Sequence, residues 1–387
     1  MKIAILGYGT IGSGVYKIIQ QYKTKCIHDL EVVKVFDQPN NKNKLEIITS
    51  DIDDILGDST IECIVETMGG IHPAYEFISA ALANGKHVVT ANKAVVAAYI
   101  KEFVTLANKH NVRFLFEATT GGGIPWLAGL NKAKRVDSIN QFYGIFNGTS
   151  NYILDAMTKH KKTFDEVLRK TQVLGYAEAD PSADIDGYDV QNKIVISSAV
   201  AFDSIVNMDD FLCYGIRNIK KEDIEYFEHK QYVIKYIGEA VKTQDTYEAF
   251  VMANAFDYDQ VEANIGLNFN IVTLYGRSID SLKFYGQGAG RLPTANAIVQ
   301  DIVDIETLQT AYDFNLDVSL VYQAMQKNSY VLRYKDKIEN NDIDYSNKFE
   351  DYYYNHTKEI TADQLRSITN DLQLDQLFVV KIANYKG

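Results

Sequence analysis

A glycine-rich motif near the start of the chain restricts the fold more than any other feature. The apolar run 2–6 ends at Gly7, and the pattern Gly-x-Gly-x-x-Gly continues through Gly9 and Gly12 into a segment with helical spacing. In the order strand, motif, helix, the first glycine allows a tight turn and the second lets a pyrophosphate approach the backbone, while the third lets the helix pack against the strand. The helix N-terminus adds N–H donors and a positive partial charge. This order favours a dinucleotide-binding domain over a chance glycine turn.

The end of the second predicted strand bears on which dinucleotide would bind. The run 31–36 is followed by Asp37, and an acid there usually accepts a hydrogen bond from the ribose 2′-OH of NAD, whereas a nearby arginine favours NADP. Position 36 is Phe36, but Lys42 and Lys44 follow, and they could meet either a 2′-phosphate or water. The preference between NAD and NADP therefore stays open.

The first third of the chain alternates between helical patterns and apolar runs. The later runs lie at 61–65, 86–90 and 112–116. This alternation predicts an α/β fold in which residues 1–130 form a doubly wound parallel sheet. Ligands bind at the carboxyl ends of the strands in such sheets. Thr67 and Lys93 follow two of these ends, although a surface position is an equal alternative for Lys93.

Glycines cluster again in two later loops. Residues 117–125 include three successive glycines after a predicted strand, which is costly in backbone entropy and suggests close approach to a ligand or ion. Residues 286–294 precede a predicted helix at 295–303, and this loop is either an anion site at a helix N-terminus or a turn. Between the two loops, a predicted strand at 138–145 and several β-rich runs within 231–286 indicate a second, mixed sheet.

An acidic stretch at 175–193 leads into an apolar run. Five carboxylates fall within a dozen residues: Glu178, Asp180, Asp184, Asp186 and Asp189. The pattern becomes helical at about Tyr188, so Asp189 and Lys193 lie four residues apart on one face. A calcium loop is excluded, because placing Gly187 at its sixth position puts Lys193 where a bidentate glutamate is required. A solvated acidic loop is the remaining alternative.

Composition narrows the class of protein. The net charge of −12 comes without a basic cluster, so neither nucleic acid nor an anionic membrane is expected as a partner. We find no apolar run of transmembrane length and no signal peptide. Cys26, Cys63 and Cys213 are widely spaced and odd in number, which suggests neither a disulfide framework nor a zinc site. We expect a cytoplasmic protein.

Together these motifs resemble those of the homoserine dehydrogenase family. The matching segments keep the family's order and cover residues 1 to about 310: 7–12, 85–93, 117–125, 147–154, 175–193 and 286–294. The resemblance implies NAD(P)-dependent, reversible interconversion of L-aspartate-4-semialdehyde and L-homoserine, on the route to threonine and methionine. It also implies an N-terminal Rossmann domain at 1–130, an α/β mixed-sheet catalytic and dimerisation domain at 131–311 whose last helix packs back on the first, and a homodimer.

The resemblance further implies roles for individual residues. Lys193 would donate the proton to the aldehyde oxygen, with Asp189 beside it and Lys93 as its partner near the nicotinamide. The substrate would be held by four residues: Glu178, Asp189, Asp184 and Tyr176. Cofactor contacts would come from Gly7, Gly9, Thr10, Ile11, Gly12, Asp37, Thr67, Lys93 and Gly290. The family's sodium site matches main-chain oxygens of Glu117, Thr120, Gly122 and Ile124.

Three features depart from the family pattern. Phe36 stands where NADP-using relatives often carry arginine, and no aspartokinase segment precedes residue 1, so we expect a monofunctional enzyme. The start of the tail, 329–334, is similar to the opening strand of the family's ACT domain, but the expected Asp-x-Pro-Gly turn is missing. With a predicted helix at 361–372 and a strand at 377–382, the region 312–387 is a small α+β remnant, too short for threonine feedback through a full ACT unit.

The chemistry explains why lysine and acidic residues belong in such a site. Reduction of an aldehyde builds negative charge on its oxygen, so a cation or acid must lie there. A second lysine would lower the pKa of Lys193, whereas Asp189 would raise it, and the sequence does not decide between them. Carboxylates of the acidic stretch can pair with the substrate's ammonium group.

Two other functions compete with this one. A phosphorylating semialdehyde dehydrogenase would need a cysteine nucleophile in the crevice, and none of the three cysteines is well placed. A catalytically silent NAD(P)-binding regulator would be expected to lack the lysines, yet Lys93 and Lys193 are both present.

Overall fold

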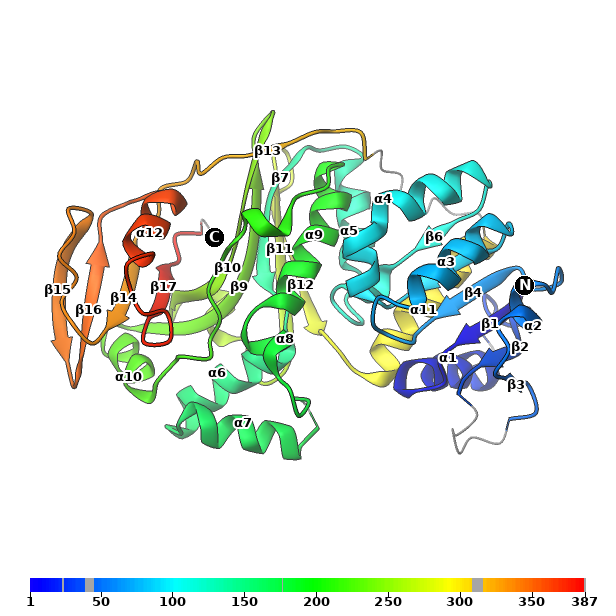
Figure 1. Cartoon of the computed structure of the whole chain (residues 1–387), viewed down its shortest axis with the longest axis horizontal. Helices are drawn as coiled ribbons and strands as arrows, with labels where there is room; N and C mark the ends of the chain where they lie inside the picture. The colour runs from blue at the N-terminus through cyan, green and yellow to red at the C-terminus, as the bar shows by residue number, and fades with distance from the viewer. Residues whose placement is uncertain (23, 39–44, 176, 308–315, 386–387) are drawn as a thin grey trace. The chain divides into compact units, whose positions relative to one another are not determined.

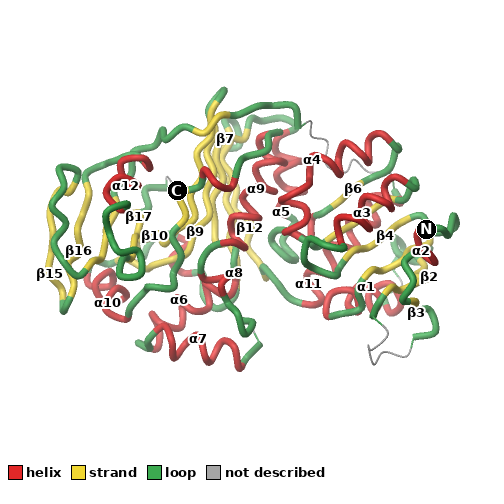
Figure 2. Tube along the Cα trace, viewed as in Figure 1, coloured by secondary structure: helices red, strands yellow, loops and turns green. Residues whose placement is uncertain are grey.

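The computed structural model describes residues 1–22, 24–38, 45–175, 177–307 and 316–385. Its contacts divide the chain into two compact units, which are not continuous in sequence (Figures 1 and 2). The first unit comprises Met1–Arg135, Ala199–Asp203 and Gly286–Asp317, and the second comprises the remaining segments. The predicted domain boundaries at residues 130 and 311 divide the chain by sequence, whereas these units are defined by contacts, so the domain boundaries stay a prediction. Within the described residues, no helix is long and apolar enough to cross a bilayer.

The first unit contains a six-stranded sheet in which every pairing is parallel. The strand order is β3-β2-β1-β4-β5-β6. The strands are β1 (Lys2–Leu6), β2 (Glu31–Phe36), β3 (Ile48–Thr49), β4 (Cys63–Glu66), β5 (His87–Thr90) and β6 (Phe114–Leu115). The helices that follow them include α1 (Thr10–Gln21), α2 (Asp53–Leu56), α3 (Ala74–Ala83), α4 (Lys93–Lys109) and α5 (Trp126–Lys134). The predicted doubly wound α/β class is confirmed.

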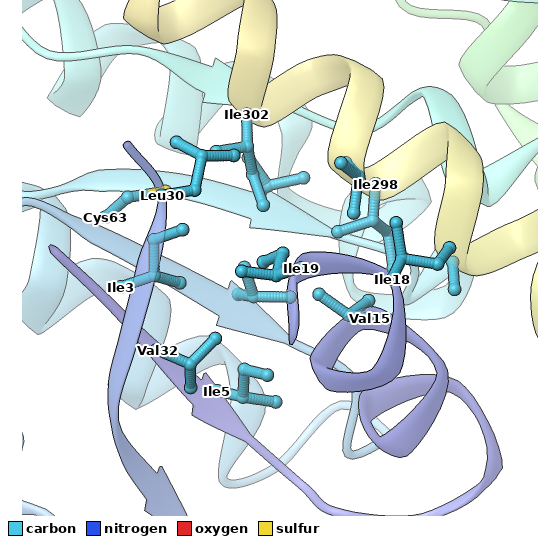
Figure 3. Close-up of a cluster of buried hydrophobic side chains, with 14 of the residues drawn as sticks. Ile3, Ile5, Val15, Ile18, Ile19, Leu30, Val32, Cys63, Ile298 and Ile302 are labelled. Atoms are coloured by element: carbon cyan, nitrogen blue, oxygen red, sulfur yellow. The ribbon is translucent and has the colours of Figure 1, made fainter. Parts of the chain in front are cut away.

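A helix from the C-terminal half of the chain completes the core of this unit. Helix α11 (Arg291–Glu306) contributes Ile298 and Ile302 to the apolar cluster that also holds Val15 and Ile19 of α1 (Figure 3). The absence of a side chain at Gly14 of α1 lets the two helices approach closely: a Cβ added there would lie 3.0 Å from the Cβ of Ala295 on α11. The segment 286–317 is therefore part of the first unit although it follows the second sheet in sequence.

The second unit is built on a mixed sheet, of eleven strands among the described residues. Its main path is β12-β11-β7-β9-β10-β17-β14-β16-β15, and β8 (Leu212–Cys213) and β13 (Val321–Tyr322) pair beside it with β10. One end of this path is β12 (Asp280–Gln287), which is followed by β11 (Phe269–Gly276), β7 (Ile139–Ile145), β9 (Tyr232–Lys242) and β10 (Thr246–Asp257). The predicted second, mixed sheet is confirmed.

Helices of the second unit position the acidic stretch. They are α6 (Gly148–His160), α7 (Phe164–Val173), α8 (Ser182–Ile185), α9 (Tyr188–Phe202) and α10 (Lys221–His229). Helix α9 lies directly on β9, because a Cβ added at Gly238 would lie 2.5 Å from Cγ1 of Val190 and 2.8 Å from Cδ1 of Ile194. The absence of a side chain at this one position lets the helix approach the strand.

The tail extends the second sheet. Strand β17 (Phe378–Ile382) pairs parallel with β10 and antiparallel with β14 (Tyr330–Tyr334). Helix α12 (Ala362–Thr369) and β17 agree with the predicted helix and strand. The hairpin of β15 (Ile343–Phe349) and β16 (Tyr352–Thr357) was not predicted from the sequence.

Candidate active site

The glycine motif forms a tight loop between β1 and α1. Gly7 has φ of 93°, and its N–H donates to the carbonyl of Phe36 at 2.9 Å. A Cβ at Gly12 would lie 2.0 Å from the oxygen of Gly7, so only glycine fits there, whereas a Cβ at Gly9 would meet nothing within 4 Å. Gly9 thus leaves open space beside the start of α1.

The start of α1 has the properties of an anion site. Thr10 and Ile11 are its first residues, and the described residues supply neither a side-chain cap nor an acidic side chain in the first turn. The first N–H groups of a helix have no partner within the helix and carry a positive partial charge. Together with the open side at Gly9, this arrangement fits the pyrophosphate of a dinucleotide.

Thr67 holds the glycine loop in place. Its hydroxyl donates to the carbonyl of Gly7 at 2.8 Å and lies 3.1 Å from that of Leu6. Asp37 follows β2 and is half-buried, and its carboxylate accepts from the N–H of Gln38 at 2.8 Å. Lys42 and Lys44 lie outside the described residues.

The ends of β4 and β5 are joined by a buried carboxyl group. Glu66 accepts from the hydroxyl of Thr90 at 2.5 Å and from the N–H of Met68 at 2.7 Å. Burial raises the pKa of Glu66. Asn92 caps α4 through the N–H of Val95 at 3.3 Å. The sequence placed Glu66 at the carboxyl end of a strand but did not predict the burial of its side chain, since an acid after an apolar strand looks the same whether buried or exposed.

Lys93 is the first residue of α4 and is half-buried at the carboxyl end of β5. A cation at a helix N-terminus is unfavourable, because the positive end of the helix dipole lies there. This position agrees with the prediction that Lys93 follows the carboxyl end of a strand of the parallel sheet.

The two later glycine loops pack on each other. A Cβ at Gly122, where φ is 59°, would lie 2.5 Å from the carbonyl carbon of Gly288, and Gly123 donates to the oxygen of Gln287 at 3.2 Å. The close approach that these glycines allow is therefore to the chain's own backbone. Gly290, with φ of 133°, precedes the first residue of α11.

The predicted cation ligands belong to the loop 117–125. The carboxylate of Glu117 accepts from the N–H groups of Leu127 at 3.0 Å and Ala128 at 2.7 Å at the start of α5, while its main-chain oxygen accepts from the N–H of Thr120 at 3.2 Å and keeps a second lone pair. The hydroxyl oxygen of Thr120 is buried without a hydrogen-bond partner in the described structure. Ile124 accepts from the N–H of Trp126 at 2.8 Å, which leaves its carbonyl a second lone pair.

Lys193 is held in a buried ion pair in the second unit. Its Nζ donates to Oδ2 of Asp189 at 2.7 Å and to the carbonyl of Phe146 at 2.6 Å. The side chains of Lys193 and Asp189 are 9% and 3% exposed. Helix α9 and the end of β7 thus bring together the ammonium and carboxylate that the sequence placed on one helix face.

The five carboxylates of 175–193 separate into distinct roles. Asp186 binds Nε of Arg217 at 2.9 Å, and Asp180 accepts from the N–H and hydroxyl of Ser182. Asp184 and Asp189 both accept from the amide of Asn147. Glu178 is exposed, and within the described residues no hydrogen bond or ion pair engages its carboxylate. Tyr176 lies outside the described residues.

Two of the three cysteines are poorly suited to act as nucleophiles. Burial raises the pKa of the Cys63 thiol, and it raises the pKa of the Cys213 thiol to about 12, so neither forms a thiolate at neutral pH. Cys26 is exposed. Among the described residues, no group of three or more His, Cys, Asp and Glu could hold a metal ion.

Comparison with known proteins gives one family over most of the chain. A family model described as "Homoserine dehydrogenase" matches residues 125–303, and one described as "Homoserine dehydrogenase, NAD binding domain" matches 7–117. A homoserine dehydrogenase of Synechocystis is 40% identical over 326 residues, covering 81% of this chain and 75% of that protein. One of Bacillus subtilis is 35% identical over 319 residues, covering 79% and 72%. The crystal structure of a homoserine dehydrogenase from Thiobacillus denitrificans superposes with a TM-score of 0.88 at 29% identity, covering 99% and 98%.

Proposed function

We propose how the site works, proceeding from the fact that this chain belongs to the homoserine dehydrogenase family. Members of the family interconvert L-aspartate-4-semialdehyde and L-homoserine with a nicotinamide cofactor. The observation that supports our assignment of roles is the buried pair of Lys193 and Asp189, at 2.7 Å, inside the acidic stretch.

The glycine loop and the start of α1 hold the dinucleotide. Gly7, Gly9 and Gly12 shape the loop, and Gly9 leaves the space for the pyrophosphate. Thr10, Ile11, Thr67 and Gly290 complete the contacts, and Asp37 at the end of β2 favours a free ribose hydroxyl, as in NAD. Lys42 and Lys44 favour a 2′-phosphate, so the assay below is run with both cofactors. When bound, the nicotinamide supplies the hydride that reduces the carbonyl carbon.

Lys193 donates the proton to the carbonyl oxygen. Negative charge develops on that oxygen as the aldehyde is reduced, and an ammonium group stabilises it and supplies the proton. Asp189 and the carbonyl of Phe146 orient the ammonium, since both accept from it at 2.6–2.7 Å. Lys93 would be the second cation of the reaction, as the family resemblance implies.

Glu178, Asp184 and Asp189 bind the substrate, with Tyr176. A carboxylate pairs with the substrate's ammonium group through a charge-assisted hydrogen bond. Asp180 and Asp186 are not assigned this role, and their carboxylates accept from Ser182 and Arg217 respectively. The exposed carboxylate of Glu178 is the one most accessible to an incoming substrate.

A sodium ion at the 117–124 loop is a further part of the proposal. The main-chain oxygens of Glu117, Thr120, Gly122 and Ile124 would coordinate it, and the partnerless hydroxyl of Thr120 fits a nearby ligand. Sodium chloride should then raise the melting temperature more than tetramethylammonium chloride at equal ionic strength. Equal effects of the two salts would contradict the site.

The test of the catalytic role is Lys193→Ala. Loss of the donor should lower kcat by at least about 10²–10³-fold, because a single group that stabilises the developing charge has that effect. The affinity for NAD(P)H, measured by fluorescence titration, should be unchanged. A kcat close to that of the wild type would remove Lys193 from the mechanism.

The substrate role is tested with Glu178→Ala. We expect a raised KM for the semialdehyde with kcat preserved. Asp180→Asn is the matched control on the same segment, because the amide oxygen can still accept from the N–H of Ser182, so KM should stay at the wild-type value. Equal KM values for the two variants would contradict the assignment.

Membership of the homoserine dehydrogenase family also supports a cytoplasmic location and a homodimer. Light scattering after gel filtration tests the oligomeric state. The assay with homoserine and either cofactor also separates the competing functions. A silent regulator would bind NAD(P) without turnover, and a phosphorylating semialdehyde dehydrogenase would require phosphate and lose activity to a thiol reagent.

A further inference from the structure

Asn147 occupies the corner between β7 and α6, with only 4% of its surface exposed. Its Oδ1 accepts from the N–H of Ser150 at 2.7 Å, which caps α6. A main-chain N–H can only donate, so the carbonyl of the Asn147 amide must face Ser150 and the NH₂ group must face the other way. That NH₂ group donates to Oδ1 of Asp184 at 2.6 Å and to Oδ2 of Asp189 at 2.8 Å.

The amide thus lies between two carboxylates of the substrate-binding stretch. Asp189 is buried and Asp184 is half-buried. Two carboxylates close to each other in such a site repel, and a donor between them offsets that repulsion. Asp189 uses the same oxygen, Oδ2, for Asn147 and for Nζ of Lys193. Its position is therefore fixed from both sides.

The corner itself is rigid. A Cβ at Gly148 would lie 2.7 Å from the oxygen of Asn268, so the backbone there has no room to move toward it. One turn later, Asn151 donates to the carbonyls of Ile265, Leu267 and Phe269. The residue before the corner, Phe146, supplies the second acceptor of Lys193. Residues 146 and 147 therefore contact both members of the Lys193–Asp189 pair.

We propose that Asn147 is a positioning residue of the reaction: it holds Asp184 and Asp189 together and, through Asp189, directs the ammonium of Lys193 toward the carbonyl oxygen. Asn147 touches none of the reacting atoms. This inference rests on the proposed role of Lys193.

Two variants keep the cap of α6 and change the hydrogen bonds from residue 147 to Asp184 and Asp189. Asn147→Ser retains an oxygen that can accept from Ser150 but is too short to reach both carboxylates. Asn147→Asp also retains a cap, but it replaces the NH₂ donor by a third carboxylate oxygen. We expect kcat to fall about 10²-fold in both, as for a misplaced catalytic group, with unchanged affinity for NAD(P)H.

The pH profile separates positioning from damage to the fold. The charged groups bonded to this corner are Asp184 of α8 and Asp189 and Lys193 of α9. In Asn147→Asp three carboxyl groups converge, so one keeps its proton to a higher pH than a lone carboxyl and can donate a hydrogen bond. The activity of Asn147→Asp relative to the wild type should be highest at low pH and should fall as the pH rises.

Thr163→Ala is the control for a lost cap. It removes the capping box of α7, which is exposed, and should lower the melting temperature while leaving kcat unchanged. Wild-type kcat in Asn147→Ser would overturn the inference. A loss in both variants with a flat relative pH profile would also overturn it, because that result indicates structural damage only.

The outcomes distinguish this inference from the proposed function. If Asn147→Asp does not fold, Asn147→Ser decides the question through kcat measured against cofactor affinity. If Lys193→Ala is active, the proposed function fails. If Lys193→Ala is inactive while Asn147→Ser has wild-type kcat, only the role of Asn147 fails.

Discussion

Replacing Lys381 in the tail should destabilise the second unit strongly. Its Nζ lies 2.6 Å from Oε2 of Glu239 on β9, and the two side chains are 3% and 2% exposed. Glu239 also accepts from Nε2 of Gln141 at 2.8 Å and from the hydroxyl of Tyr385 at 2.8 Å. In Lys381→Ala the carboxylate keeps two neutral donors but loses its counter-ion.

The magnitude follows from the burial of the pair. Removing one partner of a buried ion pair costs about 3–5 kcal/mol, because the remaining charge stays in a poorly solvated site. The two remaining hydrogen bonds place the expected loss near the lower end, at about 3 kcal/mol. For a unit of this size, a loss of about 3 kcal/mol lowers the melting temperature by about 6–12 °C.

Urea unfolding followed by circular dichroism measures the loss, and two further variants control it. Lys381→Met combined with Glu239→Gln removes both charges at similar volume and should regain most of the stability. Lys162→Ala breaks an exposed pair with Glu166, whose side chains are 56% and 50% exposed, and should cost at most about 1 kcal/mol. If Lys381→Ala costs no more than Lys162→Ala, or if the double variant is no better than the single one, the reasoning is refuted.

Four other perturbations have defined outcomes. Gly12→Ala should lower the melting temperature, because its Cβ would meet the carbonyl of Gly7. Gly9→Ala should fold normally but bind NAD(P)H at least about 10-fold more weakly, since its Cβ fills the space of the ligand. Equal melting temperatures for the two variants would contradict the difference expected between the two glycines. Gly238→Ala should lower both stability and kcat, because α9 must move off β9; unchanged kcat would show that α9 tolerates the shift. Burial lowers the pKa of His356 to about 4, so the unfolded chain binds a proton that the folded chain does not, and stability should fall as the pH drops from about 6.5 to about 4; the same slope in His356→Gln would exclude this histidine as the cause.

The sequence predicts elements well where local periodicity is strong. The run 31–36 coincides with β2, and the helix and strand predicted for the tail agree with α12 and β17. The hairpin β15–β16 was missed because most of its positions are exposed or half-buried and rich in Asp, Asn, Lys and Tyr, so no apolar alternation marks it.

Contacts between residues far apart in the sequence could not be predicted from local patterns. Nothing near Gly14 indicates that Ala295 packs against it, and the successive glycines of 121–123 suggested a ligand where the structure places the backbone of Gly288. Asn147 illustrates the same limit for the site: its motif gives a helix cap, but only the fold brings Asp184 and Asp189 to its amide. Lys193 and Asp189 could be paired in advance because they lie one helical turn apart.

Strand β9 separates the tail from the catalytic helix, and this predicts how Lys381→Ala affects activity. Successive residues of a strand face opposite sides, so Gly238 admits Val190 and Ile194 of α9 while Glu239 binds Lys381 on the other face. The register of β9 is fixed by its pairing with β10 along its whole length, and a one-residue slip would move every buried side chain to the wrong face. Loss of Lys381 should therefore weaken the fold without moving α9. At a temperature where the variant is folded, kcat should stay within about twofold of the wild type, because the packing that holds α9 is on the face of β9 that the substitution does not touch. A tenfold loss there would mean that the strand itself shifts.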